Sequence, residues 1–391
     1  MPADTAANAR TPIIGKPAFV VFLVMVIIGL AAFALEVFGG HPGKAWQVYL
    51  INFMVFSGIA QGGLVFSAIM HTTRARWSGP LSGVAESFTA FFPVSVALFV
   101  IMLAGHAHVL PGLHHDLHGK EVWLNLPFLF TRDLIGLLIL YGTGLAYVRA
   151  AMALKQGNEA VRGRVNVLAI VYLMVFALIL SLLGYDLIMS VDPHWYSTLF
   201  GAYTFVKAIY VGLAGIIITA ALLHLSPSVA FSLKPNQFHD IGKLFFAFCL
   251  LWADFFYCQL VVIWYGNIPE ETSFVIERTM TQPWNALAWG VFIAGFIGPF
   301  LILINQRIKT MPKAMIAICS VVLVAIWMEH YLVTGPAFHH HTAHLPLNLT
   351  DLFISIGFLG LMAAAVSWGM NTFPDLVRGA PIDSEAAKEV A

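Results

Sequence analysis

The sequence predicts an all-α integral membrane protein with about ten transmembrane helices. Of its 391 residues, 59% are hydrophobic and only 10% are charged, whereas a soluble globular domain carries about 25% charged residues. A soluble core could not bury so many apolar side chains. The formal net charge is zero, so the chain offers no basic surface for nucleic acid. The lipid bilayer is therefore the expected environment, and no nucleic-acid partner is expected.

Ten apolar stretches are each long enough to cross the hydrocarbon, which takes about 20 helical residues. They lie near residues 17–38, 46–71, 81–105, 127–150, 164–189, 198–225, 240–266, 283–305, 313–334 and 349–371. Helices are expected because unpaired backbone polar groups are not tolerated in lipid. The first stretch is longer than the apolar core of a signal peptide, and no clear cleavage site follows it. We therefore expect it to be a retained helix.

The loops differ in charge from one side of the membrane to the other. Most Lys and Arg residues lie in the N-terminal segment, in the loops after spans 2, 4, 6 and 8, and in the C-terminal tail. Positive loops stay on the cytoplasmic side, so both termini are expected to be cytoplasmic.

A weak internal repeat divides the predicted helices into two sets. Span 5 carries Asp186 shortly before Pro193, and span 9 carries His330 shortly before Pro336. Parallel repeats of four helices each, spans 2–5 and spans 6–9, explain this spacing. The expected parts are a cytoplasmic N-terminus (1–16), a peripheral helix (17–45), a first four-helix bundle (46–189), a second bundle (190–334), an outer loop with the tenth helix (335–371), and a cytoplasmic tail (372–391).

Ionisable side chains within the spans are costly in lipid, so each is a functional candidate. One set is expected near the outer ends of the first bundle, converging on one pocket: His106, Arg132, Asp133, Tyr185 and Asp186. A second set is a candidate proton path: Glu86, Lys207, Asp254, Gln259, Glu329 and His330. Structural alternatives stay open. Arg132 and Asp133 could only join helices, Glu86 could reach the cytoplasmic headgroups, and Lys207 could form an ion pair with Asp254.

The first set suits quinol oxidation, which releases two protons and two electrons. Such a site needs proton acceptors beside an apolar slot, and a buried carboxylate or a neutral histidine is a suitable acceptor. The three cysteines, Cys249, Cys258 and Cys319, lie in apolar runs, with no CxxC, CxxCH or Cys/His finger. No iron–sulfur, c-haem or metal site is therefore predicted in this chain. We expect the redox centre to lie on a partner chain.

Four strings resemble one family of membrane proteins. They are SVDPHWYSTLFG at 190–201, IWYGNIPEET at 263–272, LNLPF at 124–128 and PAFHH at 336–340. In this order they resemble the NrfD/polysulfide-reductase family of quinone-interacting membrane subunits. The likeness is greatest to the large membrane subunits of alternative complex III, the second one above all. It runs from about span 2 to span 10.

This resemblance implies a ten-helix fold with two four-helix bundles in a bacterial inner membrane. It implies a subunit that is not catalytic alone and has no haem or iron–sulfur cluster. Its substrate would be menaquinone or another quinone, and its partners would be iron–sulfur and cytochrome c-type subunits on the outer face, with a second homologous membrane subunit. The implied quinone site maps onto His106, Arg132, Asp133 and Asp186. In the second subunit this pocket is implied to be vestigial, with proton conduction as its role.

Three other functions stay open at this stage. The resemblance extends to the membrane subunit of the menaquinone reductase of sulfate reducers, in which electrons flow the other way. A secondary transporter would also use the intramembrane Lys207, Asp254 and Glu329 together with a parallel repeat. A b-type cytochrome would need two facing histidines, but His71 and His224 lie at the inner ends of their spans.

Overall fold

The computed structural model describes residues 12–114, 117, 119–227, 229, 231–339 and 344–378. These residues form helices and connecting turns, and no β-strand occurs among them. Ten helical spans in this part of the chain are long and apolar enough to cross a membrane. The predicted helical class and the predicted number of spans are therefore confirmed. Most of the expected cytoplasmic N-terminus and tail lies outside the described residues, as do residues 340–343.

Seven spans are single helices: α2 (Lys16–Phe38), α3 (Pro42–Thr72), α7 (Leu126–Lys155), α9 (Phe200–Leu225), α10 (Pro235–Gly266), α15 (Pro312–Phe338) and α16 (Leu349–Thr372). The third span is α4 (Pro80–Ser87), η1 (Phe88–Phe91) and α5 (Phe92–Ala104). The fifth is α8 (Arg162–Leu183), η4 (Gly184–Ile188) and η5 (Met189–Val191), and the eighth is α12 (Trp284–Phe292), η6 (Ile293–Ile297) and α13 (Gly298–Leu303). The short helices are α6 (His106–Val109), η2 (Pro111–His114), η3 (Glu159–Val161), α11 (Pro269–Thr279), α14 (Gln306–Lys309) and α17 (Asp375–Arg378).

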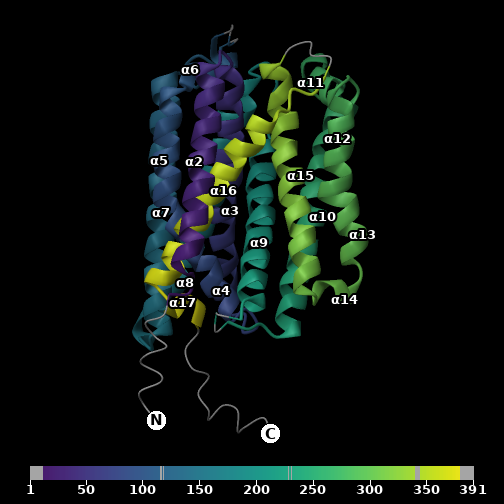
Figure 1. The fold of residues 1–391 in the computed structure, drawn as a ribbon. Coiled ribbons are helices and arrows are strands. Elements are labelled where there is room, and N and C mark those ends of the chain that lie inside the picture. Colours follow the sequence, from purple (N-terminus) through teal and green to yellow (C-terminus); the bar gives the residue numbers. More distant parts are fainter. Residues whose placement is uncertain are drawn as a thin grey trace, which may run out of the picture.

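The spans lie side by side, and the described chain begins and ends at the same end of the bundle (Figure 1). We call this end, which carries the start of α2 and all of α17, the terminal face. The opposite end carries α6 and α11 and is called the distal face (Figure 1).

Helices α3 and α9 form the centre of the bundle because glycines let their backbones touch. A Cβ atom on Gly62 of α3 would lie 1.9 Å from the carbonyl oxygen of Ala208 in α9. A Cβ atom on Gly212 of α9 would lie 2.4 Å from the carbonyl carbon of Gly62. Small residues at helix crossings allow this approach in membranes. The two halves of the chain, one before and one after the loop at residues 192–199, are therefore closely packed along α3 and α9.

Two spans contain π-helical turns, which are rare and often occur at functional sites. The first, η4, comes near the distal end of the fifth span and contains Tyr185 and Asp186. The second, η6, interrupts the eighth span between α12 and α13. Each turn changes the direction in which the following side chains project, so both bear on the sites described below.

Candidate functional site

Arg132 of α7 and Asp186 of η4 form a buried ion pair near the distal face. Arg132 Nε donates to Asp186 Oδ2 at 2.7 Å, and Arg132 NH2 lies 2.6 Å from Oδ1. Trp123 Nε1 donates to the same carboxylate at 3.0 Å, and its ring lies 3.8 Å from the guanidinium. The Asp186 side chain is fully buried. Because its carboxylate accepts hydrogen bonds from both Arg132 and Trp123, the position of Asp186 is fixed.

Asp133, the next residue of α7, is in the opposite situation. It is fully buried, no donor reaches either of its carboxylate oxygens, and it lies beside the carboxylate of Asp186. Burying an ionised carboxylate without a hydrogen-bond donor costs at least several kcal/mol of free energy, because transfer of a charged group out of water is unfavourable. Protonation or a hydrogen-bond donor from a ligand would relieve that cost. Asp133 is therefore the group in this cluster that is suited to bind and release a proton.

The other two residues predicted for this pocket are placed differently. Tyr185 is half-buried, and its hydroxyl donates to the carbonyl oxygen of Thr198 at 2.6 Å. His106 is exposed on α6, and its ring is hydrogen-bonded to the carbonyl oxygen of Leu103 at 2.9 Å. The structure thus brings together three of the five predicted residues, while Tyr185 joins the loop before α9 and His106 faces outward.

A second buried charge cluster joins α9 to α15. Lys207 Nζ lies 2.7 Å from Glu329 Oε2, and Tyr203 Oη donates to Glu329 Oε1 at 2.8 Å. His330 Nδ1 lies 3.4 Å from Glu329 Oε2 and 2.9 Å from the carbonyl oxygen of Ile326. The ion pair considered between Lys207 and Asp254 is wrong, because Lys207 points into the α9–α15 interface.

Asp254 and Gln259 lie apart from this cluster. Asp254 is exposed on the outer surface of α10, where its carboxylate is 4.0 Å from Cys258 Sγ. Gln259 accepts a hydrogen bond from Ser197 at 3.1 Å. Three of the six residues predicted for the proton path, Lys207, Glu329 and His330, therefore share one cluster.

Glu86 belongs to a third polar cluster, near the terminal face. Its carboxylate is fully buried, is paired with Lys155 Nζ at 2.7 Å, and accepts from Ser67 Oγ at 2.8 Å. Tyr147 is hydrogen-bonded to Ser67 at 2.9 Å and also to His71. The alternative that Glu86 reaches the headgroups is wrong, because its carboxylate is buried and is paired with Lys155 inside the protein.

Further hydroxyl groups form a hydrogen-bonded network in the interior of the first half of the chain. Ser95 is hydrogen-bonded to both Ser57 and Tyr141 at 2.6 Å, and Gln61 donates to Tyr141 at 2.6 Å. Tyr172 donates to the carbonyl oxygen of Gln61 at 2.9 Å. Linked hydroxyls of this kind can relay protons. This network could not be predicted from the sequence, since isolated Ser and Tyr residues are common in apolar spans.

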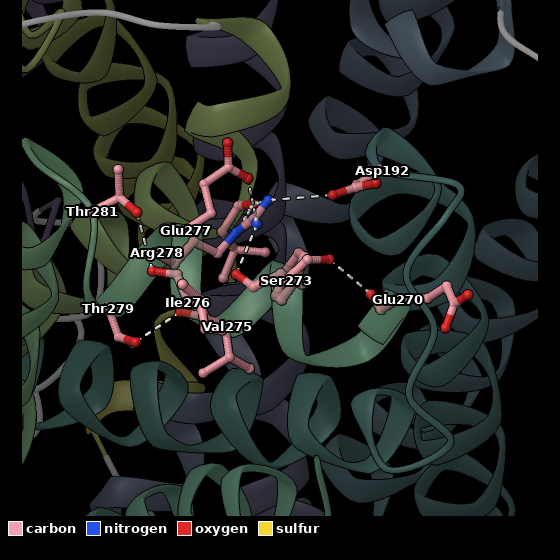
Figure 2. Close-up of polar contacts among 11 residues, drawn as sticks. Asp192, Glu270, Ser273, Val275, Ile276, Glu277, Arg278, Thr279 and Thr281 are labelled. Carbon is pink, nitrogen blue, oxygen red and sulfur yellow. Dashed lines mark hydrogen bonds and ion pairs between the residues drawn. The ribbon is translucent and has the colours of Figure 1, made fainter. Parts of the chain in front are cut away.

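Arg278 of α11 was not predicted, and it ties the distal face together (Figure 2). Its Nε and NH2 donate to the carbonyl oxygen of Val333 at 3.0 and 2.9 Å. Pro336, which has no N–H, interrupts the helical hydrogen bonding of α15 in this region. Asp192 lies 3.8 Å and Glu277 3.4 Å from the guanidinium (Figure 2). Burial lowers the pKa of Arg278 to about 10 against the pull of both acids, so it stays charged at neutral pH.

Within the described residues, no group of three or more His, Cys, Asp or Glu side chains is arranged to hold a metal ion. Comparisons with protein-family models and with curated proteins gave no match for this sequence.

Proposed function

We propose that this chain is the cofactor-less membrane subunit of a respiratory complex. In this proposal it exchanges electrons between the quinone pool and iron–sulfur or cytochrome c-type partners on the distal face. The observation that carries the proposal is Asp133, a fully buried carboxyl group that no donor reaches and that lies beside Asp186. It directly follows Arg132 in α7, whose ion pair with Asp186 fixes the surrounding polar groups.

The chemistry assigned to this site is proton acceptance. Quinol loses two protons and two electrons to become quinone, and the electrons pass to the partner subunit. In its ionised form Asp133 would take the first proton from a quinol hydroxyl, because its carboxylate oxygens are not engaged by donors. The second proton would pass to water at the distal face. Asp186, held by Arg132 and Trp123, would orient the pocket.

Two further features of the proposal follow from the sequence and the buried charges. The terminal face is assigned to the cytoplasm of a bacterial inner membrane, and residues 46–189 and 190–334 are assigned to two parallel four-helix bundles. The Glu86–Lys155 pair near the terminal face and the Lys207–Glu329 pair between α9 and α15 support a role in moving protons as electrons are exchanged. A second homologous membrane subunit is a further partner in this proposal.

The direct test is to purify the tagged chain from its native membranes in mild detergent and to identify the subunits that come with it. Added menaquinol is then expected to change the visible spectrum of the complex as haem or iron–sulfur partners become reduced. Reoxidation of a reduced cytochrome by added menaquinone alone would instead assign the reverse reaction. A single colourless protein, from a preparation in which other respiratory complexes stay intact, would reject the proposal and favour a transporter.

A further inference from the structure

The second half of the chain contains a cavity near the distal face that the proposed site does not use. It has a volume of about 100 Å³ and lies between α9, α10, α11, α12 and α15. Its walls are mainly apolar, and seven of the lining residues are aromatic: Trp195, Phe200, Tyr203, Trp252, Phe256, Phe274 and Phe292. Glu329, of the buried cluster described above, also lines it. Flat aromatic walls with a few polar groups are typical of sites for ring-shaped ligands.

A groove leads from this cavity along the outside of the protein. The groove has a volume of about 650 Å³ and runs between α10 and the π-helical turn η6 in the eighth span. Phe256, Leu260 and Phe292 line both the cavity and the groove, so the two spaces adjoin. The other groove residues are apolar apart from Asp254 and Tyr257, and several are exposed on the lipid-facing surface. The groove is therefore suited to an apolar chain that continues into the bilayer.

Two indole N–H groups line the cavity, and that of Trp195 has no partner. Trp195 is 4% exposed, and its Nε1 has no acceptor; Trp252 is 2% exposed, and its Nε1 interacts only weakly with the Tyr203 hydroxyl. A buried donor without an acceptor costs about 1–3 kcal/mol. An occupant with acceptor oxygens would recover that cost.

The cations near the cavity are already committed to the protein. Arg278 donates to the carbonyl oxygens of Val333 and Phe274. Lys207 is paired with Glu329. A phosphate headgroup would therefore find no free cation among the lining residues, whereas a neutral ring needs none.

We propose that the cavity and groove form a second quinone-binding site, with the ring between Trp195 and Trp252 and the isoprenoid tail in the groove. The indole N–H groups would donate to the ring carbonyl oxygens. The ligand class rests on the proposed function, while the location does not depend on the Asp133 site. This site would hold a quinone at the edge of the protein, where it can exchange with the bilayer between α10 and the eighth span.

The test uses the full chain, with any bound subunits, in nanodiscs made from native lipids. A photoreactive azido-quinone with a prenyl tail is bound and cross-linked, and the labelled peptides are identified by mass spectrometry. Ala288→Trp fills the cavity from α12, and Ala286→Trp places the same side chain on the exposed face of that helix. Labelling of α10 and α12 peptides is expected to fall about tenfold or more in A288W, which corresponds to about 1.4 kcal/mol of binding free energy. Labelling in A286W is expected to match the unaltered chain.

Finer variants test the donors. Trp195→Phe and Trp252→Phe keep the rings but remove the N–H groups, and each is expected to weaken labelling of the α10 and α12 peptides. Trp264→Phe, at an exposed position of α10, is the matched control and is expected to have no effect. Labels confined to α7 and η4, equal in A288W and the unaltered chain, would overturn this site while leaving the proposed function standing. Loss of a phospholipid but not of quinone from A288W would also overturn it. Absence of label anywhere would contradict the quinone assignment as a whole.

Discussion

Lys207 Nζ lies 2.7 Å from Glu329 Oε2, and both side chains are only 4% exposed. The two residues are 122 positions apart in the sequence and belong to α9 and α15. Removing one partner of a buried ion pair leaves an uncompensated charge, whereas removing both does not.

We therefore expect Lys207→Met and Glu329→Gln each to lower the free energy of unfolding by about 3–5 kcal/mol. The double variant is expected to lose less than the sum of the two. Thermal unfolding in detergent, arranged as a double-mutant cycle, measures the coupling. The exposed pair Arg162 and Glu159 is the control, with an expected coupling of at most about 0.5 kcal/mol. Equal coupling in both pairs would show that Lys207 and Glu329 do not act as a buried pair.

Asp133 and Asp186 are expected to respond differently to the same substitution. Asp186→Asn leaves the guanidinium of Arg132 without its counter-charge, so thermal stability should fall, by about 3 kcal/mol or more. Asp133→Asn removes a charge that has no partner, so stability should stay the same or rise. Quinol-dependent reduction of the partner subunits should nevertheless fall about 100-fold in D133N, as for loss of a general base.

The measurements for this pair are thermal unfolding and the rate of quinol-dependent reduction in the assembled complex. Glu159→Gln, on the exposed surface, controls for loss of a carboxylate. Normal turnover in D133N would remove Asp133 from the quinone site, and unchanged stability in D186N would contradict its anchoring role.

Arg278 is expected to hold α11 against the end of α15. Arg278→Gln keeps some hydrogen-bonding capacity but cannot donate two hydrogen bonds to the carbonyl oxygen of Val333. Helix α11 should therefore separate from α15 more often. Bonds from a charged donor contribute about 1.5–3 kcal/mol each. Limited proteolysis of the segment 266–283 should therefore become faster, while cleavage of the terminal-face loops stays the same. Uniform acceleration at both faces would point to global destabilisation instead.

Gly62 permits the contact between α3 and α9. Gly62→Ala places a Cβ atom 1.9 Å from the carbonyl oxygen of Ala208, so the helices must separate. We expect a loss of about 2 kcal/mol or more, as for overpacked cores. Gly142→Ala is the matched control, because its Cβ atom meets nothing within 4 Å. Thermal unfolding of the two variants in the same detergent makes the comparison, and equal melting temperatures would contradict the close crossing.

Asp254 is expected to be dispensable for the stability of the isolated chain. Its carboxylate is exposed on α10. It does not pair with Lys207, because Lys207 is paired with Glu329. Asp254→Leu should change the free energy of unfolding by at most about 0.5 kcal/mol, as for a surface position. Glu329→Leu, at a buried position, is the contrasting variant and should be strongly destabilising. A large loss in D254L would show that Asp254 has a buried partner.

The sequence by itself determined the fold class and the number of spans. Length and hydropathy of a segment are local properties, and the bilayer imposes the same length on each span. It also identified most of the ionisable residues, since an Arg or Asp in an apolar stretch stands out without knowledge of its partner.

Only the tertiary structure decided which of these residues meet. Arg132 pairs with Asp186, which is 54 residues away in the sequence, and Lys207 pairs with Glu329 rather than with Asp254. The rotation and crossing of the helices set the direction of each of these side chains. The cavity beside Trp195 and Trp252 likewise could not be predicted, since it is lined by residues of five helices and of the loop before α9. Such pairings and cavities depend on the packing of distant segments, which the periodicity of a single helix does not encode.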